Sequence, residues 1–347
     1  MNKNKVLLGM SGGIDSTVSI KLLQAQGFEV IGLTLRLFSN FINDNSPAQL
    51  AEMLGIKHSY IDISEEFNEK IIGYFVTEYL AGKTPFPCVV CNETIKWKYL
   101  LKYADVFDCY WVATGHYVNK IEDNGFFYLQ KGIDDDKDQS FFLWRLTQQQ
   151  LRRSIFPLGK YLKSEVKKLA VNFGFPALTE KKESVGACFI PTDYRLFLNN
   201  EIQKRNVTIN EGSFRLENET FVGKHKGYPY FTVGQRRGLG GNFKTPMYVY
   251  RIDSKENKVY LGEKEKLFKN NFTVEKICFA NESDISENKE VIVKIRYRKQ
   301  ATPAKIQLLG NQKAKILLLE PLDSIAPGQA AAFYSENRLL GGGFISE

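Results

Sequence analysis

Several features that would narrow the function are missing from this sequence of 347 residues. It contains only five cysteines, and no apolar run approaches the ~20 residues that a membrane-spanning helix needs. We find neither an internal repeat nor a low-complexity segment. Val6 to Leu8 form the first apolar triplet, and Asp15 follows too soon for a secretory signal peptide. We therefore expect a cytoplasmic protein that begins with its first strand and has no disulfide framework.

Positive charge is in excess, with a net charge of +8 and an isoelectric point near 9.0. This balance is compatible with a nucleic-acid partner, although a solvated basic surface has the same signature.

The length suits two or three domains, and the pattern along the chain changes twice. Apolar periodicity predicts strands at 5–10, 28–38, 58–63 and 109–114, and helices at 16–26, 47–54, 65–80, 92–104, 161–174 and 191–204. This alternation is typical of a parallel sheet with helices on both faces. Gly-bounded alternating segments follow at 212–216, 220–227, 230–241, 247–253 and 258–263, and only strands from about 268. We expect an α/β nucleotide-binding domain (1–200), a small β-rich domain (201–266) and a C-terminal β-barrel (267–347).

The segment GMSGGIDS, Gly9 to Ser16, joins the first expected strand to the first expected helix. Its glycine N–H groups, its hydroxyl groups and the helix N-terminus can surround an anion. It lacks the Lys-Ser/Thr pair of a Walker loop and the GxGxxG spacing of dinucleotide folds. It resembles the SGGxDS loop of ATP pyrophosphatases, which holds the pyrophosphate of ATP. That resemblance implies that Asp15 helps to bind Mg²⁺.

Two of the five cysteines lie together in TPFPCVVCNETIKW, at Cys88 and Cys91. A redox pair, half of a metal site, a nucleophile with a neighbour and chance are all compatible with this spacing. With Asn92 as its N-cap, the expected helix 92–104 would begin at Cys91 and favour the reactive thiolate, with Lys96 one turn further on. Cys188 follows the small residues ESVGA, whereas Cys109 and Cys278 lie in apolar strands and are expected in the core.

Further motifs occur in a fixed order. They are ATGHY (113–117), KDQSFFLWRL (137–146), FPLG (156–159), GACFI (186–190), GQRRGLG (234–240), RYR (296–298), PGQAAAFY (327–334) and LGGG (340–343). With the glycine loop, they make the whole chain resemble the MnmA-type tRNA 2-thiouridylases. The resemblance implies that ATP adenylates O2 of the wobble uridine of tRNA, that pyrophosphate leaves, and that sulfur then replaces AMP at C2. Such a reaction requires the uridine to leave the anticodon stack.

The resemblance also implies roles for single residues. ATP would be bound by Gly9, Met10, Ser11, Gly12, Gly13, Ile14, Asp15, Ser16, Leu35 and Gly115. Cys91 would be the catalytic cysteine, and Cys188 would receive the persulfide from an upstream sulfur donor. The tRNA would be contacted by Phe86, Pro87, Cys88, His116, Lys137, Asp138, Gln139, Arg296, Tyr297 and Gln329.

Two features depart from the family pattern. The stretch 35–50 is shorter than usual, and Cys88 stands where the family has Asp. Cys88, Cys91 and Cys188 together would be three thiolates, enough for a [4Fe–4S] cluster with one open iron for sulfide. Structural zinc normally needs four ligands. A persulfide route through Cys91 and Cys188 is the alternative, and the substitution at Cys88 makes the cluster the favoured route of the two.

Two other functions are compatible with parts of the pattern. An amidating ATP pyrophosphatase would use the same loop without a cysteine pair. A non-catalytic RNA-binding relative would need neither, and the intact SGGIDS loop argues against it.

Overall fold

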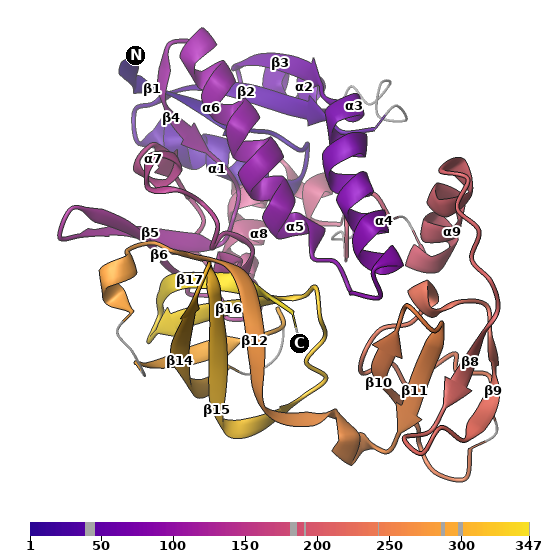
Figure 1. The fold of residues 1–347 in the computed structure, drawn as a ribbon. Coiled ribbons are helices and arrows are strands. Elements are labelled where there is room, and N and C mark those ends of the chain that lie inside the picture. The colour runs from indigo at the N-terminus through magenta and orange to yellow at the C-terminus, as the bar shows by residue number, and fades with distance from the viewer. Residues whose placement is uncertain are drawn as a thin grey trace.

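The computed structural model describes residues 1–38, 46–180, 186–190, 192–241, 243–285, 289–297 and 301–346. Its N-terminal part is built on a five-stranded sheet with strand order β3-β2-β1-β4-β7, and all of its pairings are parallel (Figure 1). The strands are β1 (Asn2–Gly9), β2 (Glu29–Arg36), β3 (Lys57–Asp62), β4 (Cys109–Ala113) and β7 (Ser154–Ile155). The predicted parallel sheet is confirmed.

Helices cover both faces of this sheet. The helices of the described chain are α1 (Ile14–Ala25), α2 (Ser46–Met53), α3 (Ser64–Phe67), α4 (Gly73–Leu80), α5 (Pro87–Cys91), α6 (Trp97–Val106), α7 (Gln148–Arg152), α8 (Lys163–Asn172) and α9 (Tyr194–Lys204), and α9 packs against α4, above the small central sheet (Figure 1). On the central strand β1, Leu7 belongs to the core beneath α6, whereas Val6 and Leu8 belong to the core beneath α1 and α2. All three are fully buried, as expected for a strand covered on both sides.

The helix that carries the first two cysteines starts earlier than the sequence predicted. It runs through α5, a π-helical turn η3 (Asn92–Lys96) and α6, so that it begins at Pro87 and not at Asn92. Proline suits the first position of a helix, because its fixed φ is helical and its missing N–H is not needed there. A second π-helical turn, η2 (Asn68–Ile72), joins α3 to α4 in the same way.

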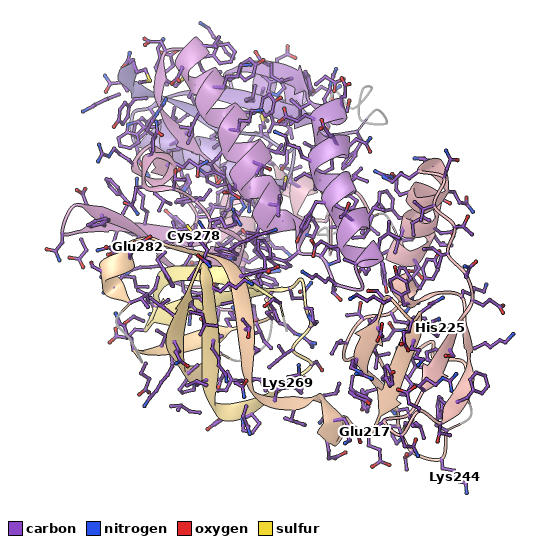
Figure 2. The ribbon with its side chains drawn as sticks, in the orientation of Figure 1. Glu217, His225, Lys244, Lys269, Cys278 and Glu282 are labelled. Atoms are coloured by element: carbon purple, nitrogen blue, oxygen red, sulfur yellow. The ribbon has the colours of Figure 1, made fainter. Side chains whose placement is uncertain are left out.

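The central part is a small sheet with strand order β10-β11-β8-β9. Its strands are β8 (Gly212–Arg215), β9 (Phe221–His225), β10 (Tyr248–Asp253) and β11 (Lys258–Gly262). The expected strand-like segment at 230–241 is wrong, because these residues form turns and irregular backbone. His225 lies in β9 of this sheet (Figure 2).

The C-terminal part is an antiparallel barrel with strand order β12-β15-β14-β13-β16-β17, closed by pairing of β12 with β17. Its strands are β12 (Phe268–Phe279), β13 (Glu290–Lys294), β14 (Thr302–Gly310), β15 (Lys313–Asp323), β16 (Ala330–Ser335) and β17 (Arg338–Ile345). The predicted barrel is confirmed. Cys278 lies in β12 and packs against the core of the N-terminal part (Figure 2).

A hairpin from the N-terminal part extends the sheet of the barrel. Strands β5 (Val118–Asp123) and β6 (Phe126–Lys131) pair with each other, and Leu129 of β6 pairs with Leu339 of β17. The pattern of the sequence did not predict this hairpin. No helix in the described ranges is long and apolar enough to cross a membrane.

Candidate active site

The glycine loop lies at the carboxyl end of β1, where it leads into α1. Gly12 has a φ of +73°, which glycine adopts without strain, and Gly13 is the N-cap of α1. The hydroxyl groups of Ser16 and Thr17 donate to the carbonyl oxygen of Gly13, at 2.9 and 3.0 Å. In this state the two hydroxyls therefore stabilise the turn, and the exposed Ser11 leaves its own hydroxyl at the surface of the loop.

Two other predicted ATP residues lie at the same edge of the sheet. Gly115 follows β4, and a Cβ atom at this position would lie 3.1 Å from the Cβ atom of Asp15 and 3.2 Å from the amide nitrogen of Ser16. Only glycine permits so close an approach without displacing the start of α1. Leu35 lies near the carboxyl end of β2, the neighbour of β1. Their role in binding ATP stays a prediction.

The carboxylate of Asp15 is already engaged. The Nζ atom of Lys163 lies 2.7 Å from Oδ1 and 2.8 Å from Oδ2, and the Tyr117 hydroxyl donates to Oδ1 at 2.7 Å. Sequence reasoning named neither partner, because neither residue lies in the loop motif. Across the described ranges, no three His, Cys, Asp or Glu side chains form a group that could hold a metal ion. Coordination of Mg²⁺ by Asp15 therefore stays a prediction.

The position of Cys91 corrects one expectation. Cys91 ends α5 and enters the π-helical turn, so it lies inside the helix and not at its N-terminus. Asn92 is not a cap, because it is buried and its Nδ2 atom donates to the carbonyl oxygen of Phe142 at 3.0 Å. Cys88 occupies the first turn instead. A helix N-terminus therefore cannot be what activates Cys91.

Loss of solvation is the largest influence on the acidity of the three thiols, although Cys91 is buried, Cys88 half-buried and Cys188 exposed. It raises the pKa of Cys91 to about 12, from an ordinary value of 9.0, and it raises the pKa of Cys88 and Cys188 as well. The positive charge of Lys96 opposes this shift at all three thiols. Ala187 and Phe189, the residues on either side of Cys188, pack in the same apolar core as Cys91, so the fold brings together the two cysteines that sequence reasoning singled out as catalytic. All three are free thiols.

Lys96 is thus the cation of the thiol cluster, and its removal should slow thiol chemistry. The π-helical turn between Cys91 and Lys96 places them about one turn apart. We expect Lys96→Gln to slow alkylation of Cys91 by iodoacetamide about threefold to tenfold at pH 8, because the thiolate that reacts becomes rarer. In the native chain, the rate at Cys91 should keep rising above pH 9, since its pKa is raised to about 12.

Mass spectrometry of alkylated peptides measures both effects. Lys102→Gln, an exposed change further along the same helix, is the matched control and should leave the rate unchanged. Equal rates for the Lys96→Gln and native proteins would contradict an electrostatic role for Lys96.

Aromatic rings from three separate segments form a stack beside the start of α5. Phe86 stacks on Phe142, with ring centres 5.6 Å apart and planes 12° from parallel, and Tyr297 lies 4.8 Å from Phe142 on a tilted plane. All three are half-buried. The structure thereby unites Phe86 and Tyr297, two predicted RNA contacts. Phe142 was missed as a site residue, although it stands in the motif KDQSFFLWRL.

Two other predicted RNA contacts form hydrogen bonds inside the protein, and one of them joins the barrel to the segment before α5. The side-chain amide of Gln329 donates to the carbonyl oxygens of Thr84 and Pro85, at 3.2 and 3.0 Å. Arg296 donates from Nη2 to the carbonyl oxygen of Ser324 at 2.8 Å. Arg298, the last residue of RYR, lies outside the described residues, as do residues 183–185 before Cys188.

The segment Lys137 to Gln139 is more internal than expected. Asp138 is 1% exposed and accepts hydrogen bonds from the backbone of Gly132 and Ser140 and from the Ser140 hydroxyl. Gln139 accepts from the Tyr117 amide at 3.0 Å. In this state Asp138 supports the backbone, and Lys137 is the half-exposed cation of the segment. Their contacts with RNA stay predictions.

His116 lies beside Trp97, with ring centres 5.8 Å apart, and its Nδ1 atom is 2.8 Å from the Thr114 hydroxyl. Burial, assisted by Lys96, lowers the pKa of His116 to about 3. The imidazole is therefore neutral near pH 7 and can exchange hydrogen bonds with a ligand but cannot attract a phosphate by charge.

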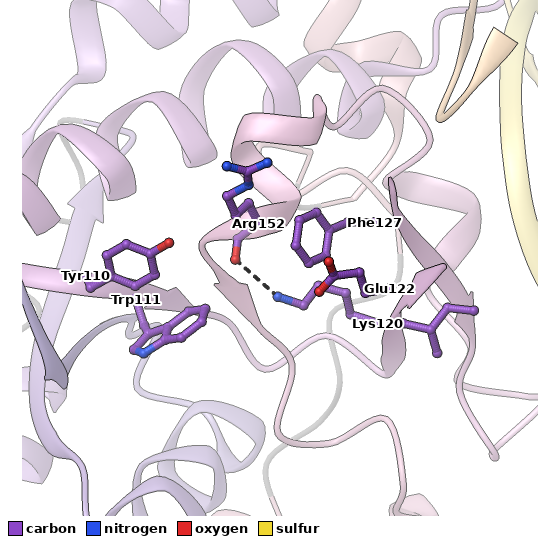
Figure 3. Close-up of a pocket in the computed structure, with 7 residues that line it drawn as sticks. Tyr110, Trp111, Lys120, Glu122, Phe127 and Arg152 are labelled. Atoms are coloured by element: carbon purple, nitrogen blue, oxygen red, sulfur yellow. Dashed lines mark hydrogen bonds between the residues drawn. The ribbon is translucent and has the colours of Figure 1, made fainter. Parts of the chain in front are cut away.

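A cavity of about 440 Å³ lies between β4, the β5–β6 hairpin and α7 (Figure 3). Trp111 and Phe127 line it together with Lys120, which donates to the carbonyl oxygens of Leu151 and Arg152 at 3.0 and 3.4 Å. Burial lowers the pKa of Lys120 to about 8. None of the predicted site residues lines this cavity.

Comparison with known proteins covers the chain from end to end. Three family models match in order, described as "tRNA methyl transferase HUP domain" (residues 4–192), "tRNA methyl transferase PRC-barrel domain" (196–263) and "Aminomethyltransferase beta-barrel domain" (269–345).

Whole proteins match over nearly their full length. A "tRNA-specific 2-thiouridylase MnmA 2" of Phocaeicola vulgatus is 43% identical, over 99% of this chain and 98% of its own length. A "tRNA-specific 2-thiouridylase MnmA 1" of Bacteroides fragilis is 42% identical, over 100% and 98%. That of Cytophaga hutchinsonii is 40% identical, over 99% and 97%.

Proposed function

The chain belongs to the MnmA family of tRNA-specific 2-thiouridylases, and we propose that it is an ATP-dependent sulfurtransferase that converts the wobble uridine of tRNA to 2-thiouridine. The structural observation that carries the proposal is that Cys91 packs in one apolar core with Ala187 and Phe189, the residues on either side of Cys188, in a protein that also has a pyrophosphate-type glycine loop. Neither the amidating enzyme nor the non-catalytic RNA-binding relative is favoured by any observation.

The first half-reaction uses the loop and the edge of the sheet. The loop Gly9 to Ser16 binds the pyrophosphate portion of ATP, and Gly115 leaves room for the nucleotide beside α1. O2 of the uridine attacks the α-phosphorus while N3 gives up its proton to water, the bond to the bridging oxygen of the β-phosphate breaks, and pyrophosphate leaves. Mg²⁺, held in part by Asp15, would neutralise phosphate charge.

The second half-reaction uses two thiols. The terminal sulfur of a persulfide on Cys188 attacks C2 of the adenylated base, and AMP leaves. The Cys91 thiol gives up its proton and attacks the Cys188 sulfur, which breaks the S–S bond and releases 2-thiouridine. A disulfide between Cys91 and Cys188 remains, and a thiol reductant must reopen it before the next turnover. A persulfide carrier or a cysteine desulfurase relay would recharge Cys188.

The two-cysteine route is supported over an iron–sulfur cluster. Cys88, Cys91 and Cys188 form no metal-holding group in the described ranges. A cluster would need all three as thiolates pointing at one centre. Cys88, where the family has Asp, then takes no part in the sulfur transfer.

The two-cysteine route predicts how the substitution Cys88→Ser affects colour and thiolation activity. We expect protein purified without oxygen to be colourless, and Cys88→Ser to keep thiolation within about threefold, because serine fills nearly the same volume. Absorbance near 400 nm, iron analysis and single-turnover thiolation measure this. Brown protein with about four irons per chain, whose colour and activity both vanish in Cys88→Ser, would establish the cluster instead.

Three further assignments accompany the function. We retain domain boundaries near 200 and 267, which lie close to the gaps between the matched family models. The half-exposed Phe86, Phe142 and Tyr297 would stack against bases of the tRNA. Because tRNA and ATP meet in the cytoplasm, we propose that the protein works there.

The decisive experiment is reconstitution. Purified protein, ATP, Mg²⁺ and a persulfide donor are incubated with a tRNA transcript bearing U34, and nucleosides are analysed by mass spectrometry. One 2-thiouridine per tRNA should form together with AMP. A C34 transcript should remain unmodified, and thiolation elsewhere or none at all would refute the assignment.

A further inference from the structure

A third thiol lies one helical turn from Cys91. Cys88 and Cys91 both belong to α5, and residues three apart in a helix have Cα atoms about 5 Å apart. This separation is within the range that disulfides span. We propose that Cys88 is a disulfide-exchange thiol, which attacks Cys91 after the sulfur has been delivered and thereby frees Cys188 for recharging. This inference rests on the disulfide between Cys91 and Cys188 in the proposed function.

Cys88 lies at the solvent end of the helical face that carries Cys91. Side chains three positions apart lie on the same face of a helix. Cys91 is 5% exposed and packs in an apolar core with Phe189, whereas Cys88 is half-exposed. A reductant in solution therefore reaches the sulfur of Cys88 more readily than the sulfur of Cys91.

The start of α5 leaves room for such a bond. A disulfide brings two Cβ atoms to about 3.8 Å, closer than the ~5–6 Å of an undisturbed helix. Cys88 follows Pro87 in the first turn, so its amide has no intrahelical acceptor to give up. Phe86, the N-cap, makes no side-chain hydrogen bond that would fix this turn. The first turn is thus the part of the helix that tightens at least cost.

The exchange conserves atoms and electrons. The Cys88 thiol gives up its proton to water, and its sulfur bonds to the sulfur of Cys91. The bond between Cys91 and Cys188 breaks, and Cys188 leaves as a thiolate that takes up a proton. The protein as a whole is neither oxidised nor reduced in this step. A dithiol reductant later supplies two electrons to the Cys88–Cys91 disulfide and is itself oxidised to a disulfide.

Burial decides which sulfur Cys88 attacks. Attack on Cys91 expels Cys188, which is exposed, so that water solvates the departing thiolate. Attack on Cys188 would expel Cys91 as a thiolate in an apolar core, where loss of solvation disfavours the charge. A poorer leaving thiolate exchanges more slowly. The short tether within one helical turn also raises the effective concentration of Cys88 at Cys91.

An idle Cys88 predicts a different oxidised protein. If the reductant opens the Cys91–Cys188 disulfide directly, that disulfide persists until the reductant arrives, and Cys188 stays blocked. If Cys88 exchanges, the disulfide comes to rest between Cys88 and Cys91, and Cys188 is free before any reductant acts. The position of the disulfide in oxidised protein therefore separates the two cases.

Peptide mapping measures this position. Trypsin leaves Cys88 and Cys91 together in the peptide 84–96, and Cys188 in a peptide that ends at Arg195. Protein without ATP or tRNA is oxidised with one equivalent of diamide, equilibrated without oxygen, blocked with N-ethylmaleimide and digested. By mass spectrometry, we expect the disulfide inside peptide 84–96 to exceed the cross-link between the two peptides about tenfold or more.

The variant Cys88→Ser should hold the disulfide at the cross-link. Alkylation of Cys188 in the oxidised protein should then fall about tenfold or more, because no thiol is left to displace it. Cys278→Ala, a change at a cysteine in the barrel, is the matched control and should give the native distribution. If Cys88→Ser does not fold, the distribution in the native chain is by itself a sufficient test.

A native chain with mainly the Cys91–Cys188 cross-link would overturn the exchange, and so would a cross-link of Cys88 to Cys188 located by fragmentation. Either result leaves the proposed thiolation standing. Because ATP and tRNA are absent, a protein that does not thiolate tRNA can still show the exchange. A Cys88→Ser protein that forms no cross-link would contradict the release disulfide itself, and with it both proposals.

Discussion

Thiolation should fall by on the order of 10³-fold or more when either Cys91 or Cys188 is replaced by serine. A hydroxyl at Cys188 cannot carry a persulfide, so no sulfur reaches C2. A hydroxyl at Cys91 cannot form the disulfide that releases the product, because an alkoxide does not replace a thiolate in thiol–disulfide exchange. Mass spectrometry of tRNA nucleosides after a single turnover measures both losses.

The two serine variants should keep the first half-reaction. Neither cysteine belongs to the glycine loop or to the Gly115 turn that contacts it, so exchange of labelled pyrophosphate into ATP in the presence of tRNA should persist. Cys278→Ala, a change at a cysteine in the barrel, is the matched control and should thiolate normally. Full thiolation by the Cys91→Ser protein would remove the release step from the mechanism.

We expect Asp15→Ala to cause a loss of comparable size, but in the first half-reaction, the adenylation of the uridine. Adenylation should become undetectable, on the order of 10³-fold or more below the native rate, because the variant loses the proposed metal contact. Affinity for tRNA should change little, since Asp15 touches Lys163 and Tyr117 and none of the predicted RNA contacts. Pyrophosphate exchange measures adenylation, and a binding assay on the same preparation measures the affinity for tRNA.

The control for this variant must address folding. Alanine removes the Asp15 carboxylate from the buried ammonium of Lys163, and breaking a buried ion pair costs about 3–5 kcal/mol. The cost here is smaller than that range, because Asp15 is 35% exposed and water reaches the pair. Asp15→Asn keeps the shape and an acceptor oxygen, so it should unfold at a temperature near that of the native chain. Normal adenylation by either variant would exclude Asp15 from metal binding.

The parallel sheet and the barrel were predictable from local patterns. Val6 to Leu8 form an uninterrupted apolar run that is typical of a doubly covered strand, and the strands after residue 268 alternate clearly. The glycine loop was also predictable, because the residues that allow its backbone conformation are adjacent in the sequence. The pairing of Cys91 with Cys188 followed from the family resemblance alone, since the two residues lie far apart in the sequence and no local pattern links them.

The features that local sequence patterns did not predict depend on residues far away in the sequence. The start of the helix at Pro87 could not be fixed, since an apolar pattern gives no sharp boundary, and the error led to a lowering of the Cys91 pKa by the helix N-terminus being expected. The π-helical turn inserts a residue that no propensity marks. Lys163 lies about 150 residues from Asp15, and only the packing of α8 on α1 brings them into contact.

The pairing of β6 with β17 has a consequence for the order in which the molecule can be completed. The two strands are separated by roughly 200 residues, and a ribosome adds about 5–20 residues per second. The hairpin therefore waits on the order of 10–40 s after its own synthesis before its partner exists. During this interval its edge is unpaired and open to wrong association. The nucleotide-binding part of a nascent chain cannot reach its final state while the barrel is still being translated, and chaperone contact with residues 118–131 is most valuable in that window.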